Sequence, residues 1–284
     1  MSLLSQAREL RQQAVAGHQP APLFAIDREE TLIIPTSAGE VKVYVHWPLM
    51  PAHHMIINFH GSGFIFPIND WDRLFCQKLS YRTHAAVFDV DYPLAPEHPF
   101  PQPLEASYTV IEEIHQRYPL FGAPTLIGHS AGGNLIIGTQ LLALRRQTDL
   151  AQRLILDYPV LDLDTTPEEK PFPDGAVNVI SPETARLFNR FYRQNQAPGN
   201  PLISPTLASA DELREFPATS ILTADHDTLM NEAETFGQEL VAAGTQVTCR
   251  RYPNSLHGFT VNETGAYEQA INDITRTVLA DWHA

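Results

Sequence analysis

The chain has 284 residues, of which 43% are hydrophobic and 18% are charged, and its formal net charge is −14. This length and composition are typical of a globular protein with a large buried core. The negative charge disfavours nucleic acid and anionic membrane surfaces as partners, because both are polyanions. No apolar run reaches roughly 18 residues, so the sequence predicts no membrane span.

The first 45 residues predict an amphipathic helix followed by a β-hairpin. Apolar residues recur at helical spacing over 1–16. Two short runs of strand character, 31–34 and 41–45, are separated by the turn-forming segment Ser37-Ala38-Gly39. We expect this hairpin to add antiparallel strands at one edge of a larger sheet.

Two features favour a cytoplasmic location. The N-terminal residues lack the basic region and the apolar core of a secretory signal. The two cysteines, Cys76 and Cys249, are too few for a disulfide framework, so we expect free thiols in a reducing compartment.

From residue 55 onward, short apolar runs alternate with segments of helical periodicity. The predicted strands are 55–59, 85–90, 125–127, 154–156, 219–223 and 247–249. The predicted helices are 70–82, 103–118, 134–147, 229–243 and 266–282. Strands that are apolar on both faces and alternate with helices indicate a mostly parallel sheet covered on both sides. The sequence therefore predicts a single α/β domain over 1–284.

One interval breaks this alternation. About 60 residues separate the strand near 153–158 from the strand near 219–224, although a crossover needs only about a dozen. The interval is rich in proline and contains an amphipathic stretch, Pro182 to Gln194, with several aromatic residues. We expect part of it, approximately 163–205, to form a lid over a cleft, and the alternative is a surface loop.

A serine between a strand and a helix is the most informative feature of the sequence. The segment Gly128-His129-Ser130-Ala131-Gly132 follows an apolar run and precedes the helical run that starts at Asn134. A serine on such a sharp turn exposes its hydroxyl to a cleft, and small flanking residues allow the strained backbone. As a nucleophile, Ser130 needs a base to accept its proton and an acid to orient that base.

Two downstream residues fit these roles by their order and position. In sheets of this type the order along the chain is serine, acid, histidine. Asp227 follows one predicted strand and His257 follows the last one. Both therefore lie at the carboxyl ends of strands, where open α/β sheets form ligand crevices.

Other side chains compete for the same roles. Asp225 precedes the preferred carboxylate by two residues, and Asp157 and Asp162 near another strand end are further candidates. His129 adjoins Ser130, but neighbouring side chains on a tight turn diverge, so we expect it to pack or hydrogen-bond behind the nucleophile. The remaining histidines show no metal-ligand spacing, and the sequence predicts no metal and no cofactor.

Acyl transfer also needs backbone N–H groups aimed at the developing oxyanion. The amide of Ala131, directly after the nucleophile, is one expected donor. The small residues of His60-Gly61-Ser62-Gly63-Phe64, which follow a predicted strand, allow further amides to turn into the cleft. A plain glycine turn is the alternative for this loop.

Five segments in order resemble the hormone-sensitive-lipase branch of the α/β-hydrolase family. That branch carries a His-Gly-Gly-Gly-aromatic loop, a Tyr-x-Leu-Ala-Pro-Glu segment, a Gly-Asp-Ser-Ala-Gly-Gly-Asn segment, an Asp-x-Leu acid and a His-Gly-Phe base. The matching positions are 60–64, 92–97, 128–134, 227–229 and 257–259. The resemblance spans about 55–282.

The resemblance implies an α/β-hydrolase fold with an eight-stranded sheet and a small lid made of approximately 1–25 and 163–205. It implies a bacterial-type carboxylesterase acting on small-molecule esters of short acyl chains, without a cofactor. Its catalytic residues would be Ser130, Asp227 and His257. A homo-oligomer is possible. An amide hydrolase of the formamidase type and a non-catalytic binding homologue are the alternatives.

Within the family's glycine loop, the resemblance implies Ser62 and Gly63 as oxyanion donors beside Ala131. Ser62 stands where the family usually has glycine, so we expect its side chain to project near the cleft, limit the acyl pocket and strain a positive φ. His129 stands where the family commonly has aspartate, with little expected consequence. The short region ahead of the loop suggests an open site.

Overall fold

One sheet of eight strands runs through the computed structural model, which describes residues 2–16, 24, 26, 28–171 and 180–282. The strand order is β1-β2-β4-β3-β5-β6-β7-β8. The pairs β1–β2 and β2–β4 are antiparallel, and every other neighbouring pair is parallel. The strands are β1 Arg28–Thr36, β2 Gly39–Trp47, β3 Met55–Phe59, β4 Ala86–Asp91, β5 Thr125–His129, β6 Arg153–Asp157, β7 Ala218–Ala224 and β8 Val247–Tyr252. The predicted hairpin and parallel sheet are confirmed.

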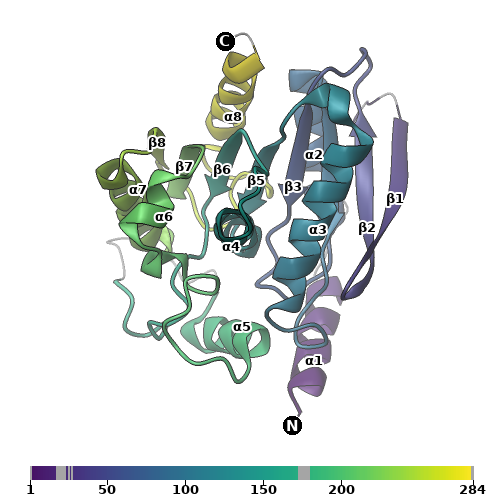
Figure 1. The fold of residues 1–284 in the computed structure, drawn as a ribbon. Coiled ribbons are helices and arrows are strands. Elements are labelled where there is room, and N and C mark those ends of the chain that lie inside the picture. Colours follow the sequence, from purple (N-terminus) through teal and green to yellow (C-terminus); the bar gives the residue numbers. More distant parts are fainter. Residues whose placement is uncertain (1, 17–23, 25, 27, 172–179, 283–284) are drawn as a thin grey trace.

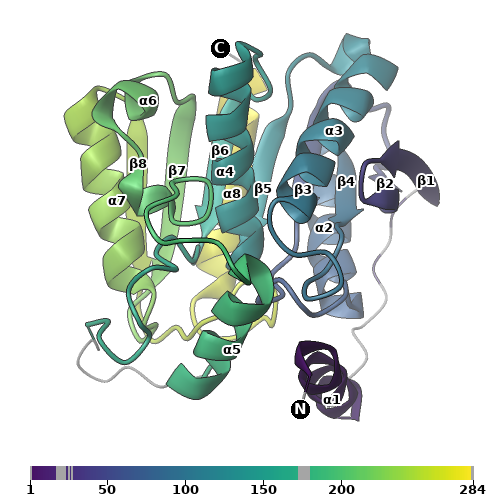
Figure 2. The same ribbon diagram turned by 60° about the horizontal axis from the view of Figure 1, so that its bottom comes forward.

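Helices cover both faces of this sheet (Figures 1 and 2). One face packs against α2 and α8, and the other packs against α3, α4 and α7, so two hydrophobic clusters form. The helices are α1 Leu3–Ala16, α2 Asp70–Thr83, α3 Gln102–Arg117, α4 Ala131–Arg146, α5 Pro182–Arg193, α6 Ala210–Arg214, α7 Met230–Ala243 and α8 Tyr267–Trp282, with 3₁₀ turns at Pro119–Phe121 and Pro205–Leu207.

The burial of each strand follows from this double cover. Every residue of β3 and of β5 is buried, because helices pack on both sides of these central strands. The edge strand β1 alternates between exposed and more buried positions, as expected for a strand with one face toward solvent. The apolar runs in the sequence are therefore the interior strands, except for 247–249, which lies in the largely exposed edge strand β8.

Helix α4 begins three residues before its predicted start. Gly132 and Gly133, residues of a type that disfavours helix interiors, lie in the first turn of this helix. The structure needs these glycines, since a Cβ on Gly132 would lie 2.0 Å from the carbonyl oxygen of Phe59. Close packing of the helix on the sheet overrides helix propensity here.

The long interval between β6 and β7 contains α5, a 3₁₀ turn and α6. Helices α5 and α1 lie at the same end of the sheet (Figure 2). The predicted lid elements, approximately 1–25 and 163–205, are only partly described, because 17–23, 25 and 172–179 lie outside the described residues.

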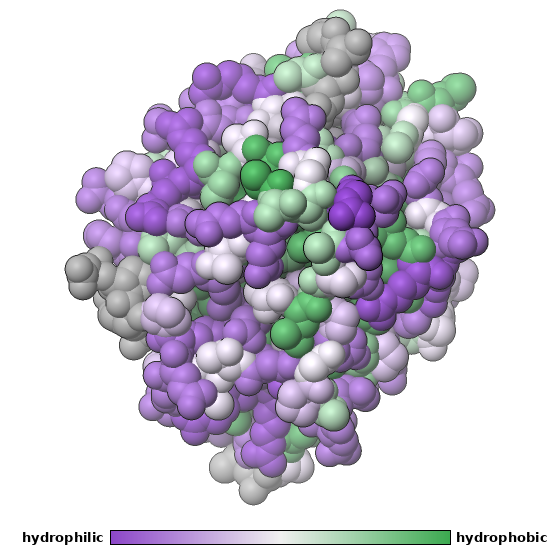
Figure 3. All heavy atoms as spheres, turned by 60° about the vertical axis from the view of Figure 1, so that its left-hand side comes forward, coloured by the Kyte–Doolittle hydropathy of each residue, from purple (hydrophilic) through white to green (hydrophobic). Residues whose placement is uncertain are grey.

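Two surface properties complete the description. On the face that Figure 3 brings forward, hydrophilic residues predominate and apolar residues form small separate patches. Among the helices of the described part of the chain, none has the length and apolar character needed to span a bilayer.

Candidate active site

Ser130 occupies the turn between β5 and α4. Its backbone has φ 51° and ψ −113°, a conformation that side-chain-bearing residues seldom adopt. A Cβ on Gly128 would lie 2.5 Å from the carbonyl oxygen of Gly132, so the turn closes only with glycine at this position. The strained turn lifts the serine hydroxyl above the carboxyl end of the sheet.

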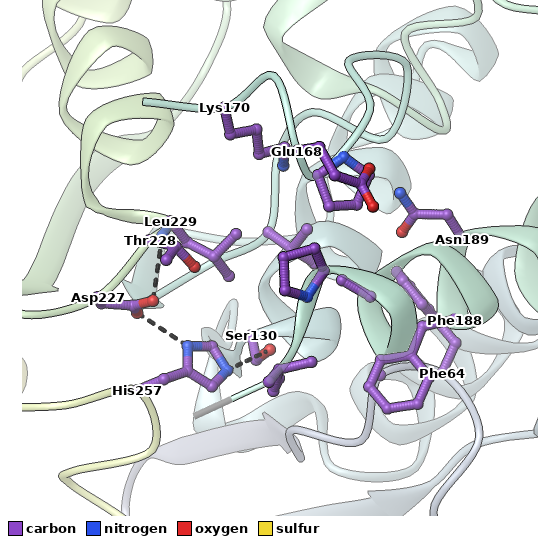
Figure 4. Close-up of a pocket in the computed structure, with 16 residues that line it drawn as sticks. Phe64, Ser130, Glu168, Lys170, Phe188, Asn189, Asp227, Thr228, Leu229 and His257 are labelled. Atoms are coloured by element: carbon purple, nitrogen blue, oxygen red, sulfur yellow. Dashed lines mark hydrogen bonds and ion pairs between the residues drawn. The ribbon is translucent and has the colours of Figure 1, made fainter. Parts of the chain in front are cut away.

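His257 bridges Ser130 and Asp227 (Figure 4). Its Nε2 lies 3.0 Å from Ser130 Oγ, and its Nδ1 lies 2.8 Å from Asp227 Oδ2. Asp227 is held in turn by the amide of Leu229, which donates to Oδ1 at 3.1 Å. Three side chains that are distant in the sequence therefore form one hydrogen-bonded line.

The competing carboxylates are engaged elsewhere. Asp225 accepts the amides of Asn254 and Ser255 and so closes the loop that leads to the histidine. Asp162 accepts two amides of its own loop. Asp157 bonds to His129. Of the four candidate carboxylates, Asp227 is therefore the one that the structure places against His257.

His129 lies behind the nucleophile, as expected, and joins a buried polar network. Its Nδ1 lies 2.8 Å from Asp157 Oδ2, and its Nε2 lies 3.0 Å from Asn58 Oδ1. Thr260, three residues after the histidine at 257, donates to the same Asp157 oxygen. The network thus ties β3, β5 and β6 to the loop that carries the base. Sequence analysis missed it, and its signal was polar residues within otherwise apolar strands.

The surroundings of His257 set its basicity. Burial alone lowers the pKa of His257, but the charge and hydrogen bond of Asp227 more than offset this effect, with smaller contributions from the charges of Asp157 and Glu232. The pKa of His257 is therefore raised above its ordinary value. The imidazole of His257 therefore accepts a proton readily at Nε2, while Asp227 holds the ring in position through Nδ1.

Three backbone amides near Ser130 in the described part of the chain have no protein partner. Within the described residues, the N–H groups of Ser62, Gly63 and Ala131 donate to no protein acceptor. A Cβ on Gly63 would lie 2.5 Å from the ring of Phe188, so only glycine fits against α5 there. Free amides beside a serine hydroxyl are suited to stabilise an oxyanion.

The expectation of a strained positive φ at Ser62 was wrong, whereas its side chain does lie near the cleft, in a hollow that Ser130 and His257 also line. Positive φ falls on Gly63 (54°) and Phe64 (67°), not on Ser62. The Ser62 hydroxyl does not stand free in the cleft, because it lies 2.5 Å from Tyr92 Oη and accepts the amide of Phe64 at 2.9 Å. The serine side chain thus satisfies polar groups within the loop.

A sequence profile described as alpha/beta hydrolase fold matches residues 56–261. This span is well over half of the chain and includes all six predicted site residues. The chain belongs to the alpha/beta-hydrolase family. The resemblance inferred from the five motifs is confirmed.

Several proteins similar to this hydrolase are named esterases. An esterase of Gibberella moniliformis is 30% identical over 273 residues, which is 90% of this chain and 84% of that protein. An esterase of Acinetobacter venetianus is 27% identical over 209 residues, 73% of this chain and 68% of that protein. The solved structure of a hyperthermophilic esterase from the archaeon Pyrobaculum calidifontis is 25% identical, with a TM-score of 0.84 and coverage of 100% of this chain and 95% of that one.

A cavity of about 170 Å³ opens onto Ser130 of the hydrolase. Its walls near the serine are apolar and include Phe64, Phe188 and Leu229, as Figure 4 shows. Its far end carries polar side chains from the long interval and from α5, namely Glu168, Lys170 and Asn189. A small apolar group therefore fits beside the nucleophile.

Lys170 links the long interval to helix α7. It forms an ion pair at 2.5 Å with Glu232 on α7. Glu232 also accepts the amides of Leu161 and Asp162, at 2.7 and 3.2 Å. Burial raises the pKa of Glu232, against the opposing charge of Lys170. One carboxylate thus anchors the start of the predicted lid.

Proposed function

We propose that this hydrolase is a serine carboxylesterase that cleaves small-molecule esters of short acyl chains. The observation that carries the proposal is the imidazole of His257, which lies within hydrogen-bond distance of both Ser130 and Asp227. A nucleophile, a base and an orienting acid in this geometry are the parts required for acyl transfer.

The reaction proceeds in two halves. Ser130 Oγ attacks the ester carbonyl while His257 Nε2 accepts the hydroxyl proton, and Asp227 stabilises the resulting imidazolium. His257 then returns the proton to the leaving alcohol as the acyl-enzyme forms. Water repeats the sequence, giving its proton to the imidazole, and the acid leaves as Ser130 regains its hydrogen.

The oxyanion of each tetrahedral intermediate is stabilised by the amides of Ser62, Gly63 and Ala131. These amides are free of other acceptors in the described residues, so no existing hydrogen bond has to break first. Removal of one such donor typically lowers turnover by about 10²–10³.

The long interval and the N-terminal helix serve as the lid of this site. Support comes from Phe188 on α5, which lines the cavity, and from Lys170, which is anchored to Glu232. Further support comes from Arg11 on α1, whose guanidinium donates at 2.7 Å to the carbonyl of Ile65, directly after the loop 60–64. The lid elements are those predicted, approximately 1–25 and 163–205.

We also place the protein in the cytoplasm. Cys76 and Cys249 are both free, one buried and one exposed, which suits a reducing compartment.

A panel of p-nitrophenyl esters from acetate to decanoate, together with an aryl formamide, tests the proposal. We expect the highest kcat/KM with the short esters and a steep fall as the chain outgrows the cavity. Faster cleavage of the formamide than of every ester would indicate that the protein is an amide hydrolase and not an esterase. No turnover of any substrate, with tight binding of an ester analogue, would indicate a binding protein.

A further inference from the structure

A second cluster of reactive side chains lies on the far side of the sheet from the α4 packing face. His46 on β2, Cys76 on α2 and Asp89 on β4 each offer one ligand atom, and these atoms lie within 4.8 Å of one another. All three residues are fully buried. The esterase mechanism uses none of them.

The polar atoms of this cluster lack the partners that buried groups normally have. His46 Nε2 and Asp89 Oδ2 have no aligned hydrogen-bond partner within the part of the chain that the structure describes, although Asp89 also interacts with the Cys76 thiol. His46 Nδ1 lies 3.1 Å from Glu29 Oε2, although the contact lacks hydrogen-bond alignment. Buried polar atoms without partners are rare in native proteins, and an ion is one of the few explanations for several that converge.

We propose that His46, Cys76 and Asp89 bind a divalent transition-metal ion, with Zn²⁺ the best match. An imidazole nitrogen, a thiolate sulfur and a carboxylate oxygen are the ligand types that zinc takes in proteins. Zinc binds them at about 2.0–2.3 Å, so tetrahedral ligand atoms lie roughly 3.3–3.8 Å apart. Because the three ligand atoms lie within 4.8 Å of one another, each pair has to close by no more than about 1–1.5 Å. Water completes the coordination.

The charges of the site balance on metal binding. Burial raises the pKa of the Cys76 thiol, and the charges of Asp89 and Asp72 add to this. Burial also raises the pKa of Asp89. Zn²⁺ displaces the proton of the thiol, and that of the carboxyl where Asp89 is protonated, and these protons pass to solvent. The thiolate and the carboxylate then neutralise the ion, which removes the main cost of a buried charge.

Glu29 is suited to orient the imidazole. Glu29 Oε2 lies 3.1 Å from His46 Nδ1, and the other oxygen of the same carboxylate pairs with Arg73. A metal-bound histidine commonly donates its other ring N–H to a carboxylate, which fixes the tautomer. Glu29 next to Nδ1 thus leaves Nε2 for the metal.

The site also connects to the nucleophile turn. Asp89 Oδ1 accepts from Asn58 Nδ2 at 2.9 Å, and Asn58 Oδ1 lies 3.0 Å from His129 Nε2. His129 directly precedes Ser130. The ion therefore has a structural role, since it fixes a carboxylate that orders the network behind the turn and does not touch substrate.

Sequence spacing did not reveal this site, because the three ligands come from separate elements and no two of them are close in the chain. The competing explanation is a metal-free arrangement in which His46 packs between Glu29 and Asp89. The two explanations differ in measurable metal content.

The first experiment measures zinc by mass spectrometry after refolding in excess ZnCl₂ and gel filtration. We expect about one zinc per chain in the wild type and in the control Cys249→Ser, which changes the exposed cysteine, and a loss of roughly tenfold or more in Cys76→Ser and His46→Gln. A wild type without bound zinc, or Cys76→Ser with full zinc content, overturns the proposal.

A second measurement does not depend on the folding of the variants. Refolding of the wild type with Co²⁺ should produce a thiolate-to-cobalt charge-transfer band, and the zinc-loaded wild type should have a higher Tm than chelator-treated protein. Absence of the band, or equal Tm values, contradicts the proposal. Ser130→Ala should keep its zinc, so failure of the proposed esterase function leaves this test intact.

Discussion

The hydroxyl oxygens of Ser62, in the loop 60–64, and of Tyr92 lie 2.5 Å apart. Tyr92 donates its own proton to the carbonyl of His60 at 2.8 Å, so Ser62 is the donor of the pair. Ser62 Oγ in turn accepts the amide of Phe64. A serine in a glycine-rich loop thus completes a chain of hydrogen bonds that fixes the direction of the neighbouring amides.

Ser62→Ala should therefore lower kcat without changing the preference for acyl chain length. We expect a loss of about tenfold, less than the 10²–10³ that follows outright removal of an oxyanion donor, because the amide remains but is less well fixed. Tyr92→Phe should have a similar effect. Steady-state kinetics with acetate and octanoate esters checks this, and an unchanged kcat with better use of octanoate would instead assign Ser62 to the acyl pocket.

The pH dependence of activity should report the environment of His257. Catalysis needs the neutral imidazole, so the acid limb of kcat/KM follows the pKa of His257 in the free enzyme. Because Asp227 raises this pKa, the limb should lie above the ordinary value of about 6.5. In Asp227→Asn the limb should move to lower pH and kcat should fall by about 10⁴. If the acid limb of kcat/KM stays at the same pH in Asp227→Asn, a group other than His257 controls it.

The network behind the nucleophile turn should contribute to stability. His129→Leu leaves Asp157 and Asn58 buried without their partner, and each such loss costs about 1–3 kcal/mol. Urea denaturation should show a decrease of about 2 kcal/mol or more in the free energy of unfolding. The control His53→Leu changes an exposed histidine and should have little effect. Equal stability of the two variants would show that the network around His129 does not stabilise the fold.

Phe188 should limit the size of the acyl or alcohol group. Phe188→Ala enlarges the cavity beside Ser130, so kcat/KM for longer esters should rise relative to acetate. Phe191→Ala makes the same change on the same helix at a fully buried position that does not line the cavity. It should lower stability and leave the chain-length profile unchanged. Identical profiles for both variants would argue against α5 as a wall of the site.

The sequence was most informative where chemistry restricts the local backbone. Ser130 could be assigned from its small neighbours, because only such residues fit the strained turn that the structure shows. His257 followed from its place after the last strand. The start of α4 was predicted three residues too late, since tertiary packing and not propensity decides that helix start.

Contacts between distant segments could not be predicted in the same way. The roles of Asn58, Asp157 and Thr260 depend on strand order, which places β3, β5 and β6 side by side. The direction of the Ser62 side chain depends on Tyr92, 30 residues away. The cluster of His46, Cys76 and Asp89 likewise exists only after β2, α2 and β4 pack together.

Covalent labelling by a fluorophosphonate, followed by peptide mass spectrometry, shows whether Ser130 is the nucleophile. We expect a single phosphonylated residue, Ser130, with loss of hydrolysis of p-nitrophenyl acetate in step with labelling, and no labelling in a folded Ser130→Ala variant. Labelling at another residue, or undiminished hydrolysis by Ser130→Ala, would contradict this assignment of the nucleophile.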